Sequence, residues 1–162
     1  MPIIRTVNDA DGPAIARLYN YYVRETTVTF EEEPVSDKEM IRRIDEITAQ
    51  FPWLVYELDD RVVGFAYAGK WKGRSAYRYT VESTVYVDRD FCGRGVGTAL
   101  YTRLLEGLRE QGIHLVIAGI AMPNPASQAL HERFGFRKVG EFTEVGYKFG
   151  TWLNVGYWEK GL

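Results

Sequence analysis

The chain has 162 residues, 46% of them hydrophobic and 26% charged, which is the size and composition of one globular domain and excludes a disordered or collagen-like chain. Its 20 Lys and Arg and 22 Asp and Glu residues give a formal net charge of -2, so the overall charge favours neither nucleic acid nor an anionic membrane as a partner. A single cysteine, Cys92, and two histidines exclude an intramolecular disulfide and argue against a metal site, so we expect no metal and a reducing cytoplasm.

The N-terminal part of the chain is expected to contain three strands and two helices. Charged residues from Arg5 onward leave no room for the apolar segment of a signal peptide. Ser36 and Glu39 form a capping-box pattern, and Asp59-Asp60-Arg61 is a hairpin signature. The expected elements are a strand at 3–7, a helix at 11–24 capped by Asn8 or Asp9, a helix at about 37–49, and strands at 53–58 and 62–69.

The rest of the chain is expected to add two helices and four strands around a buried centre. A strand at 77–87 alternates in character and carries a carboxylate, Glu82, which is unusual in a strand. The run from Leu115 to Ile120 is nearly all apolar, as is typical of a central strand buried on both faces. Helices are expected at 96–111, ending at Gly112, and at 124–134, with closing strands near 137–147 and 152–159.

Three glycines at alternate positions, Gly93, Gly95 and Gly97, follow the strand at 77–87 and lead into a helix. They let the backbone turn sharply and direct its N–H groups outward, where the helix dipole adds positive potential. The segment therefore predicts an anion cradle, with a plain tight turn as the alternative. Neither familiar phosphate motif fits, because a dinucleotide fingerprint that starts at Gly93 would need Gly or Ala in place of Thr98, and the Gly-Lys-Ser/Thr of a Walker loop is absent.

The segment Cys92-Gly93-Arg94-Gly95-Val96-Gly97 resembles the pyrophosphate loop Gln/Arg-x-x-Gly-x-Gly/Ala of the GNAT superfamily of N-acetyltransferases, with Cys92 in place of the long polar first residue. Segments across almost the whole chain are similar to its phosphinothricin and methionine sulfoximine acetyltransferase branch, among them Trp53-Leu54-Val55, Tyr67 to Lys72, Glu82 to Val87, Leu130-His131-Glu132 and Asn154 to Trp158.

This resemblance implies the fold, the domain organisation and the oligomeric state. The fold is of the α/β class, with a mixed central sheet splayed between the strands at 77–87 and 115–120 and helices on both faces. A single GNAT domain covers residues 1–162. Relatives in this branch are homodimers, and the aromatic segment Tyr147 to Trp158 suits a partner surface.

The resemblance also implies acetyl-CoA as cosubstrate, bound by three parts of the chain. The backbone of the strand end pairs with the pantetheine amides, the glycine loop holds the pyrophosphate, and the helix at 124–134 supplies two further contacts. The expected residues are Val85, Tyr86 and Val87 from the strand, Gly93, Arg94, Gly95, Val96, Gly97 and Thr98 from the loop, and Asn124 and Arg133 from the helix. Asn124 also fits a plain N-cap, and Arg133 a solvated helix face.

Two side chains are candidates for acid–base catalysis. Glu82 falls on the family's proposed catalytic glutamate, and among Tyr, Val and Thr side chains its carboxylate should have a raised pKa and act as general base. The alternative is a structural ion pair with Arg74 or Arg78. His131 takes the place of the tyrosine that faces the CoA sulfur elsewhere in the superfamily, so it is the candidate general acid, or else a partly buried histidine bonded to the backbone.

The acceptor is expected to be a small amino acid analogue: phosphinothricin, L-methionine sulfoximine or L-methionine sulfone. Arg74, Ser75 and Tyr77 match positions where this branch binds its substrate, and Arg74 can clamp a carboxylate or phosphinate with two hydrogen bonds. Phe30 is expected to wall the pocket. Phe149 stands where phosphinothricin acetyltransferases of antibiotic producers have histidine, which favours a broader small-substrate enzyme.

Two other functions remain open from the sequence. The chain can acetylate another small amine, such as a polyamine, or a protein N-terminus. A polyamine pocket would need several carboxylates before Glu82, where this chain has Arg74 and Arg78 instead. A CoA-sensing binding module would keep the glycine loop without catalysis.

Overall fold

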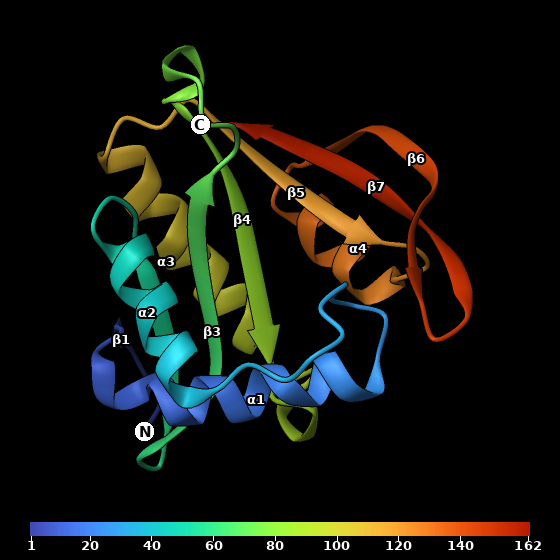
Figure 1. Cartoon of the computed structure of the whole chain (residues 1–162). Helices are drawn as coiled ribbons and strands as arrows, with labels where there is room; N and C mark the ends of the chain where they lie inside the picture. Colours follow the sequence, from blue (N-terminus) through green and yellow to red (C-terminus); the bar gives the residue numbers. More distant parts are fainter.

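The structure, a computed structural model, describes all 162 residues. Seven strands form one mixed sheet in the order β1-β2-β3-β4-β5-β7-β6 (Figure 1). Only β4 and β5 run parallel, and every other neighbouring pair is antiparallel. The strands are β1 Ile3–Thr6, β2 Trp53–Leu58, β3 Arg61–Lys70, β4 Thr80–Val87, β5 Leu115–Ala121, β6 Arg137–Lys148 and β7 Thr151–Gly161.

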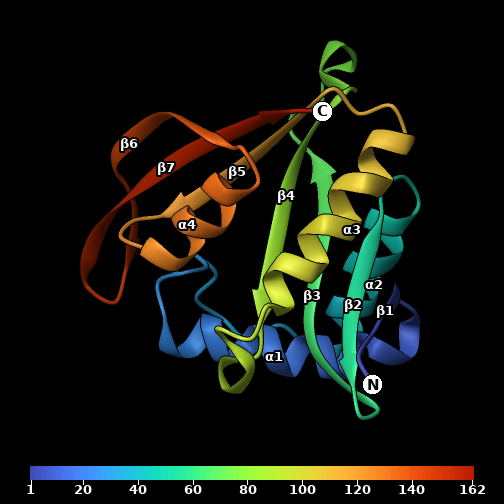
Figure 2. The same cartoon turned by 180° about the vertical axis from the view of Figure 1, so that it is seen from behind.

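Helices cover both faces of this sheet. Helices α1 (Gly12–Glu25) and α2 (Asp37–Thr48) lie on the face toward the viewer in Figure 1, while α3 (Val96–Glu110) and α4 (Pro125–Arg133) lie on the other face, in front in Figure 2. Each face has its own apolar cluster. One is built around α1 and α2 and the other around α3. Burial of these two clusters is the main force that holds the layers together.

The sheet is splayed between β4 and β5, as the resemblance implied. The two strands pair only from Thr80 to Glu82, opposite Leu115 to Ile117, although β4 continues to Val87. Beyond Glu82, β4 keeps its partner β3 but has no strand along its other edge. Except for the Val87 carbonyl oxygen, which accepts a hydrogen bond from the Tyr22 hydroxyl, the backbone groups on that edge are free to bind an extended ligand.

Several local features confirm the sequence patterns. The Ser36 hydroxyl accepts a hydrogen bond from the Glu39 N–H at the start of α2. Asp59 and Asp60 have φ values of 49° and 61° in the β2–β3 turn, which is the left-handed conformation that a two-residue hairpin needs. Gly112 ends α3 with φ 87°. None of the helices combines the length and apolar character needed to cross a membrane.

Three expectations need correction. The strand predicted at 77–87 begins only at Thr80, because Ser75–Tyr77 forms a 3-10 turn. The predicted central strand β5 is buried on one face only, because α1 and α2 pack on β2 to β4, and the other face of β5 is left partly exposed at Leu115 and Ile117 and exposed at Gly119. The helix predicted at 11–24 is found at Gly12–Glu25, but its N-cap is Asp11, because Asn8 caps a short 3-10 turn that precedes the helix.

Candidate active site

A cavity of about 730 Å³ lies at the open end of the splay, between β4, the glycine loop and α4. It brings together every residue expected to bind the cofactor except Arg94, whose guanidinium lies 5.1 Å from the centre of the Phe91 ring. A smaller cavity of about 90 Å³ shares Val28, Val85 and Tyr86 with the first and reaches between β4 and β5. The two cavities together lead from the surface to the place where the strands part.

The glycine loop has the geometry of an anion cradle. Gly93 and Gly95 have φ values of 75° and 81°, and nothing lies within 4 Å of a Cβ atom placed on either residue. Only glycine adopts this conformation without strain, so the sequence is matched to the turn. Gly95 is the N-cap of α3, and no side chain caps the helix. The free N–H groups and the dipole at this helix end therefore favour a phosphate group.

Cys92 lies on the rim of this cradle. Its thiol is exposed and lies 3.9 Å from the Tyr22 hydroxyl, which itself donates a hydrogen bond to the carbonyl oxygen of Val87. Tyr22 was not expected in the site, because its spacing in α1 fits a core position equally well. It fixes the C-terminal end of β4 beside the cavity.

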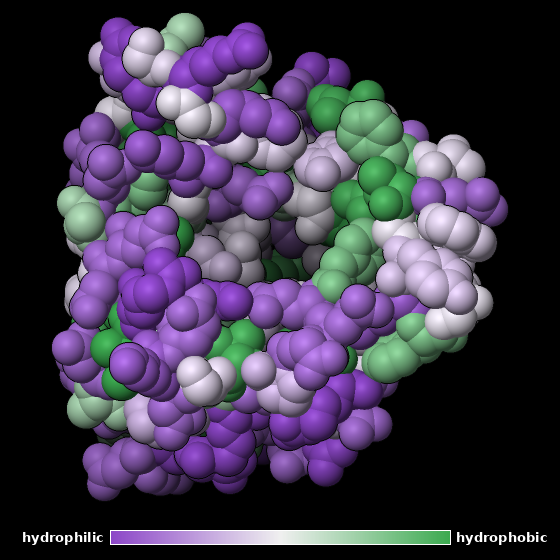
Figure 3. Space-filling view, viewed as in Figure 1, coloured by the Kyte–Doolittle hydropathy of each residue, from purple (hydrophilic) through white to green (hydrophobic).

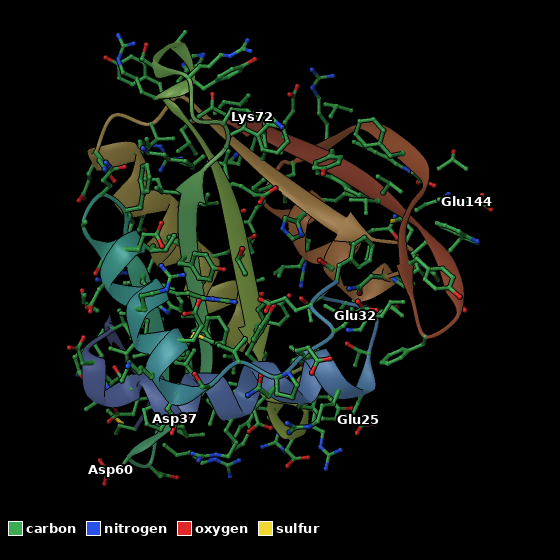
Figure 4. The ribbon with its side chains drawn as sticks, viewed as in Figure 1. Glu25, Glu32, Asp37, Asp60, Lys72 and Glu144 are labelled. Atoms are coloured by element: carbon green, nitrogen blue, oxygen red, sulfur yellow. The ribbon has the colours of Figure 1, made fainter.

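Glu82 is a half-buried carboxylate with no hydrogen bond or ion pair to any side chain or backbone group. It is opposite Gly69 of β3 and Ile117 of β5, in the last pair before the strands separate. Burial raises the pKa of Glu82, and the positive charge of Lys72, on the loop after β3 in Figure 4, opposes the shift. The alternative of an ion pair with Arg74 or Arg78 is not seen in the structure.

His131 is the end of a buried chain of hydrogen bonds on the other face of β4. Its Nε2 is 2.8 Å from the Tyr101 hydroxyl, which is 2.9 Å from the Ser83 hydroxyl, and its Nδ1 is 2.7 Å from the Ser127 carbonyl oxygen. A carbonyl only accepts, so Nδ1 carries the proton and Nε2 accepts from Tyr101. Burial lowers the pKa of His131, which keeps the ring neutral.

Two members of this chain, Ser83 and Tyr101, were missed from the sequence. Tyr101 is at an apolar position of α3 and reads as a core residue, and Ser83 reads as the inward face of a strand. Their polarity is the signal that could have found them, because each places a hydroxyl in a core that is otherwise apolar.

The two candidate catalytic groups therefore lie on opposite faces of one strand. Side chains alternate along β4, so Glu82 faces the α1 and α2 side with Tyr86, while Ser83 faces the α3 side. The gap between β4 and β5 connects the two faces. A proton acceptor on one side and proton-bearing groups on the other suit a transfer reaction in which one group loses a proton and another gains one.

The expected acceptor residues divide between two places. Arg74, Ser75 and Tyr77 line a cavity of about 190 Å³ at the end of β3, whose other basic residues are Lys70, Lys72 and Arg78. Phe30 lies apart from them, packed against the β6–β7 hairpin. Figure 3 shows a hollow at the centre of the face that carries α1 and α2, between these two places. Phe149 is exposed in the hairpin turn and lines none of the cavities described above.

Comparisons with known proteins agree with this geometry. Residues 4–155 match the family described as "Acetyltransferase (GNAT) domain". The chain belongs to the GNAT acetyltransferase family. It is 42% identical over 157 residues to the phosphinothricin N-acetyltransferase of Streptomyces viridochromogenes, covering 97% of this chain and 86% of that protein.

Two further GNAT proteins are similar over nearly the whole chain. The L-methionine sulfoximine/L-methionine sulfone acetyltransferase of Pseudomonas aeruginosa is 38% identical, covering 98% of this chain and 94% of that protein. The crystal structure of a GNAT phosphinothricin acetyltransferase from Sinorhizobium meliloti in complex with acetyl-CoA superposes with a TM-score of 0.96 at 33% identity, covering 99% of this chain and 88% of that one.

As a GNAT acetyltransferase, the chain uses acetyl-CoA, and its cavity fits that molecule. The uncapped start of α3 and the left-handed glycines suit the pyrophosphate, and the free edge of β4 suits an extended chain with amide groups. A Cβ atom on Gly97 would lie 3.4 Å from the side chain of Leu130, so the glycine loop and α4 lie close together at this point of the cavity. No group of three or more His, Cys, Asp or Glu residues is placed to hold a metal ion.

Proposed function

We propose that this enzyme acetylates the amino group of small amino acid analogues directly from acetyl-CoA, with phosphinothricin, L-methionine sulfoximine and L-methionine sulfone as acceptors. The observation that carries the proposal is Glu82, a half-buried carboxylate without a partner at the point where the sheet opens. Relatives named for these three acceptors are 38% and 42% identical to this chain, which supports the choice of substrate class.

Glu82 is the group that accepts the proton of the acceptor amine. An amine must be neutral to attack a carbonyl carbon, and a carboxylate whose pKa is raised by burial is a better base than an ordinary one. Because Glu82 has no hydrogen-bond donor of its own, its oxygens remain available to the amine, directly or through one water.

Ser83 and Tyr101 supply hydroxyl groups on the opposite face, while the one N–H of His131 is donated to the Ser127 carbonyl oxygen. Neutral His131 has no proton on Nε2, so its effect on the leaving group passes through the hydroxyl of Tyr101. The one proton of Tyr101 is donated to His131, so Tyr101 stabilises the departing thiolate by turning this proton from Nε2 to the sulfur. Both hydroxyls lie beside the smaller cavity that reaches between the strands.

The cofactor residues divide the binding of acetyl-CoA among themselves. Val85 to Val87 present backbone groups to the pantetheine arm, and Gly93 to Thr98 hold the pyrophosphate, with Arg94 adding positive charge at the rim. Asn124 caps α4 by accepting a hydrogen bond from the Ser127 N–H, which leaves its amide nitrogen for the ligand, and Arg133 offers a cation beside it. Acetyl-CoA supplies the acetyl group as a thioester, so a C–N bond forms as the C–S bond breaks.

The acceptor site is bounded by Arg74, Ser75 and Tyr77 on one side and Phe30 on the other. Arg74 takes part in no ion pair, so its guanidinium is free to bind a carboxylate or a phosphinate through two hydrogen bonds. The positive charge of the surrounding loop favours an anionic amino acid over a polyamine.

The test is a panel of amines assayed for CoA release. We expect turnover with phosphinothricin, L-methionine sulfoximine and L-methionine sulfone, and much slower turnover with spermidine or a peptide N-terminus. Turnover of only spermidine or only the peptide would show that the enzyme uses another class of acceptor. Binding of acetyl-CoA by calorimetry without turnover of any amine would identify a CoA-sensing module instead.

We also propose that the enzyme is a cytoplasmic homodimer. Six large apolar side chains of β6, β7 and their turn are each at least 50% exposed, which is a large uncovered patch for a monomer: Val139, Phe142, Val145, Tyr147, Phe149 and Trp152. A second copy would cover this patch. Analytical ultracentrifugation should give twice the 18.6 kDa chain mass, and a single 18.6 kDa species would contradict the dimer.

A further inference from the structure

An eleven-residue connection, residues 26–36, links α1 to α2 and crosses the acceptor face at the open end of the splay (Figure 1). We call it the strap. It is tied to its own half of the molecule, since the Thr29 hydroxyl is 2.7 Å from the Tyr19 hydroxyl and Glu31 forms an ion pair with Arg43. Figure 4 labels Glu32 on the strap, on the side of the β5–β7 half.

One lysine ties the strap to the β5–β7 half of the sheet. Lys148, the last residue of β6, is only 1% exposed, and its Nζ donates a hydrogen bond of 2.8 Å to the carbonyl oxygen of Thr29. This is the only hydrogen bond between the strap and residues 113–162. Burial lowers the pKa of Lys148, and the charges of Glu31 and Glu32 oppose that shift. A buried ammonium is costly unless it is hydrogen-bonded or paired, so the bond to Thr29 is the contact that offsets the burial of Lys148.

The same strand makes room for the next residue of the strap. A Cβ on Gly146 would lie 2.2 Å from the Phe30 ring, so only glycine allows the ring to lie against β6. Lys148 and Gly146 therefore hold two consecutive strap residues, Thr29 and Phe30, by a hydrogen bond and by close packing. Two contacts fix both the position of the strap and the direction of the Phe30 side chain.

These contacts span the open side of the splay. β4 and β5 are paired over only three residues at one end, and on the far face the open end is bridged by the Tyr101–His131 hydrogen bond. On the acceptor face, Lys148 makes the corresponding bridge through the strap. No other hydrogen bond joins the strap to the β5–β7 half, so without Lys148 the packing of Phe30 on Gly146 alone would hold the strap there.

We infer that Lys148 is a positioning residue for acceptor selection, which docks the strap so that Phe30 forms a fixed wall of the acceptor site. The inference rests on the proposed function for the identity of the acceptor. It does not concern the chemistry of transfer, since the ammonium of Lys148 is bonded to the strap and lines neither cavity beside β4.

The test compares Lys148→Met with Lys138→Met. Methionine keeps the length and apolar stem of Lys148 but removes the donor, while Lys138 is an exposed lysine of the same strand, paired with Glu141. For Lys148→Met we expect the KM for L-methionine sulfoximine to rise about tenfold or more, as for loss of a buried charged hydrogen bond, with kcat within about threefold of wild type. The Kd for acetyl-CoA and all parameters of Lys138→Met should stay within about threefold.

Hydrogen exchange gives a readout that does not depend on turnover. The strap amides from Val28 to Glu31 should exchange about tenfold faster in Lys148→Met than in wild type, and at the wild-type rate in Lys138→Met. An unchanged acceptor KM together with unchanged strap exchange would overturn the inference. If wild type acetylates none of the amines, the proposed function fails. Exchange alone then decides whether Lys148 docks the strap.

A second variant tests the same contact if Lys148→Met fails to fold. Gly146→Ala removes no charge and displaces the Phe30 ring, so it should raise the acceptor KM in the same way. The double variant Phe30→Ala, Lys148→Met should be no worse than the poorer of the two single variants, because both remove the same wall. A fully additive loss, or a Gly146→Ala enzyme with the wild-type KM, would contradict a role through Phe30.

Discussion

Replacing Glu82 with glutamine separates its catalytic role from any structural one. Glutamine has nearly the same shape but cannot accept the amine proton. General-base catalysis contributes about 10²- to 10⁴-fold in rate, so we expect kcat to fall by that factor, or about 3 to 5 kcal/mol in the barrier. The KM for acetyl-CoA should hardly change, because Glu82 lines neither cofactor cavity.

The same variant should lose activity without losing stability. Burial raises the pKa of Glu82 above its ordinary value of 4.5, so the folded state binds the proton more tightly than the unfolded state does. The contribution of Glu82 to stability is therefore lost as pH rises through the folded pKa, and at neutral pH its carboxylate weakens the fold. Glu82→Gln should be at least as stable as wild type at pH 7.

Two assays check this prediction together. Steady-state CoA release gives kcat and its pH profile, whose acidic limb should lie above the ordinary carboxyl range in wild type, since the base must be ionised. Urea unfolding at pH 7 gives the free energy of unfolding. A rate within a few-fold of wild type, or a clear loss of stability, would refute the assignment of Glu82 as a base held in place without a partner.

Three further substitutions test the cofactor side of the site. Tyr101→Phe leaves buried polar groups of Ser83 and His131 without a partner, so urea unfolding should show a loss of about 1–3 kcal/mol and kcat should fall, whereas unchanged values would exclude the hydrogen-bond chain. Gly95→Ala places a side chain at φ 81°, which costs about 1–2 kcal/mol and should weaken acetyl-CoA binding measured by calorimetry; equal affinity would argue against the cradle. Asn124→Ala removes the N-cap of α4 and should cost about 1 kcal/mol in thermal unfolding, with a further loss of acetyl-CoA affinity if its amide contacts the ligand; an effect on stability alone would leave it a simple cap.

Much of the fold was predictable because local patterns and tertiary packing agree. The Ser36 capping box and the Asp59-Asp60 turn each fix an element boundary through a hydrogen bond or a backbone angle that few other residues supply. The sharp turn of the glycine loop was predictable for the same reason, since Gly93 and Gly95 are required by the left-handed conformation itself.

The features that were missed depend on contacts between distant segments. Gly119 reads as buried, but it lies on the face of β5 that α1 and α2 leave uncovered, because these helices pack on β2 to β4. Tyr101 has the spacing of a core residue, so its bond to His131 is visible only in three dimensions. Lys148 looks like an ordinary charged strand residue, yet the strap 119 positions earlier buries it. The walls of the acceptor site could not be predicted from the sequence, because they are formed by two loops and a hairpin that are far apart along the chain.

The most direct test of acetyl transfer is mass spectrometry of the reaction of the purified enzyme with acetyl-CoA and L-methionine sulfoximine. The proposal predicts one N-acetylated acceptor for each CoA released, formation of this product by wild type, and a 10²- to 10⁴-fold slower rate with Glu82→Gln. CoA release without acetylated acceptor, or the same product at an undiminished rate from Glu82→Gln, would contradict it.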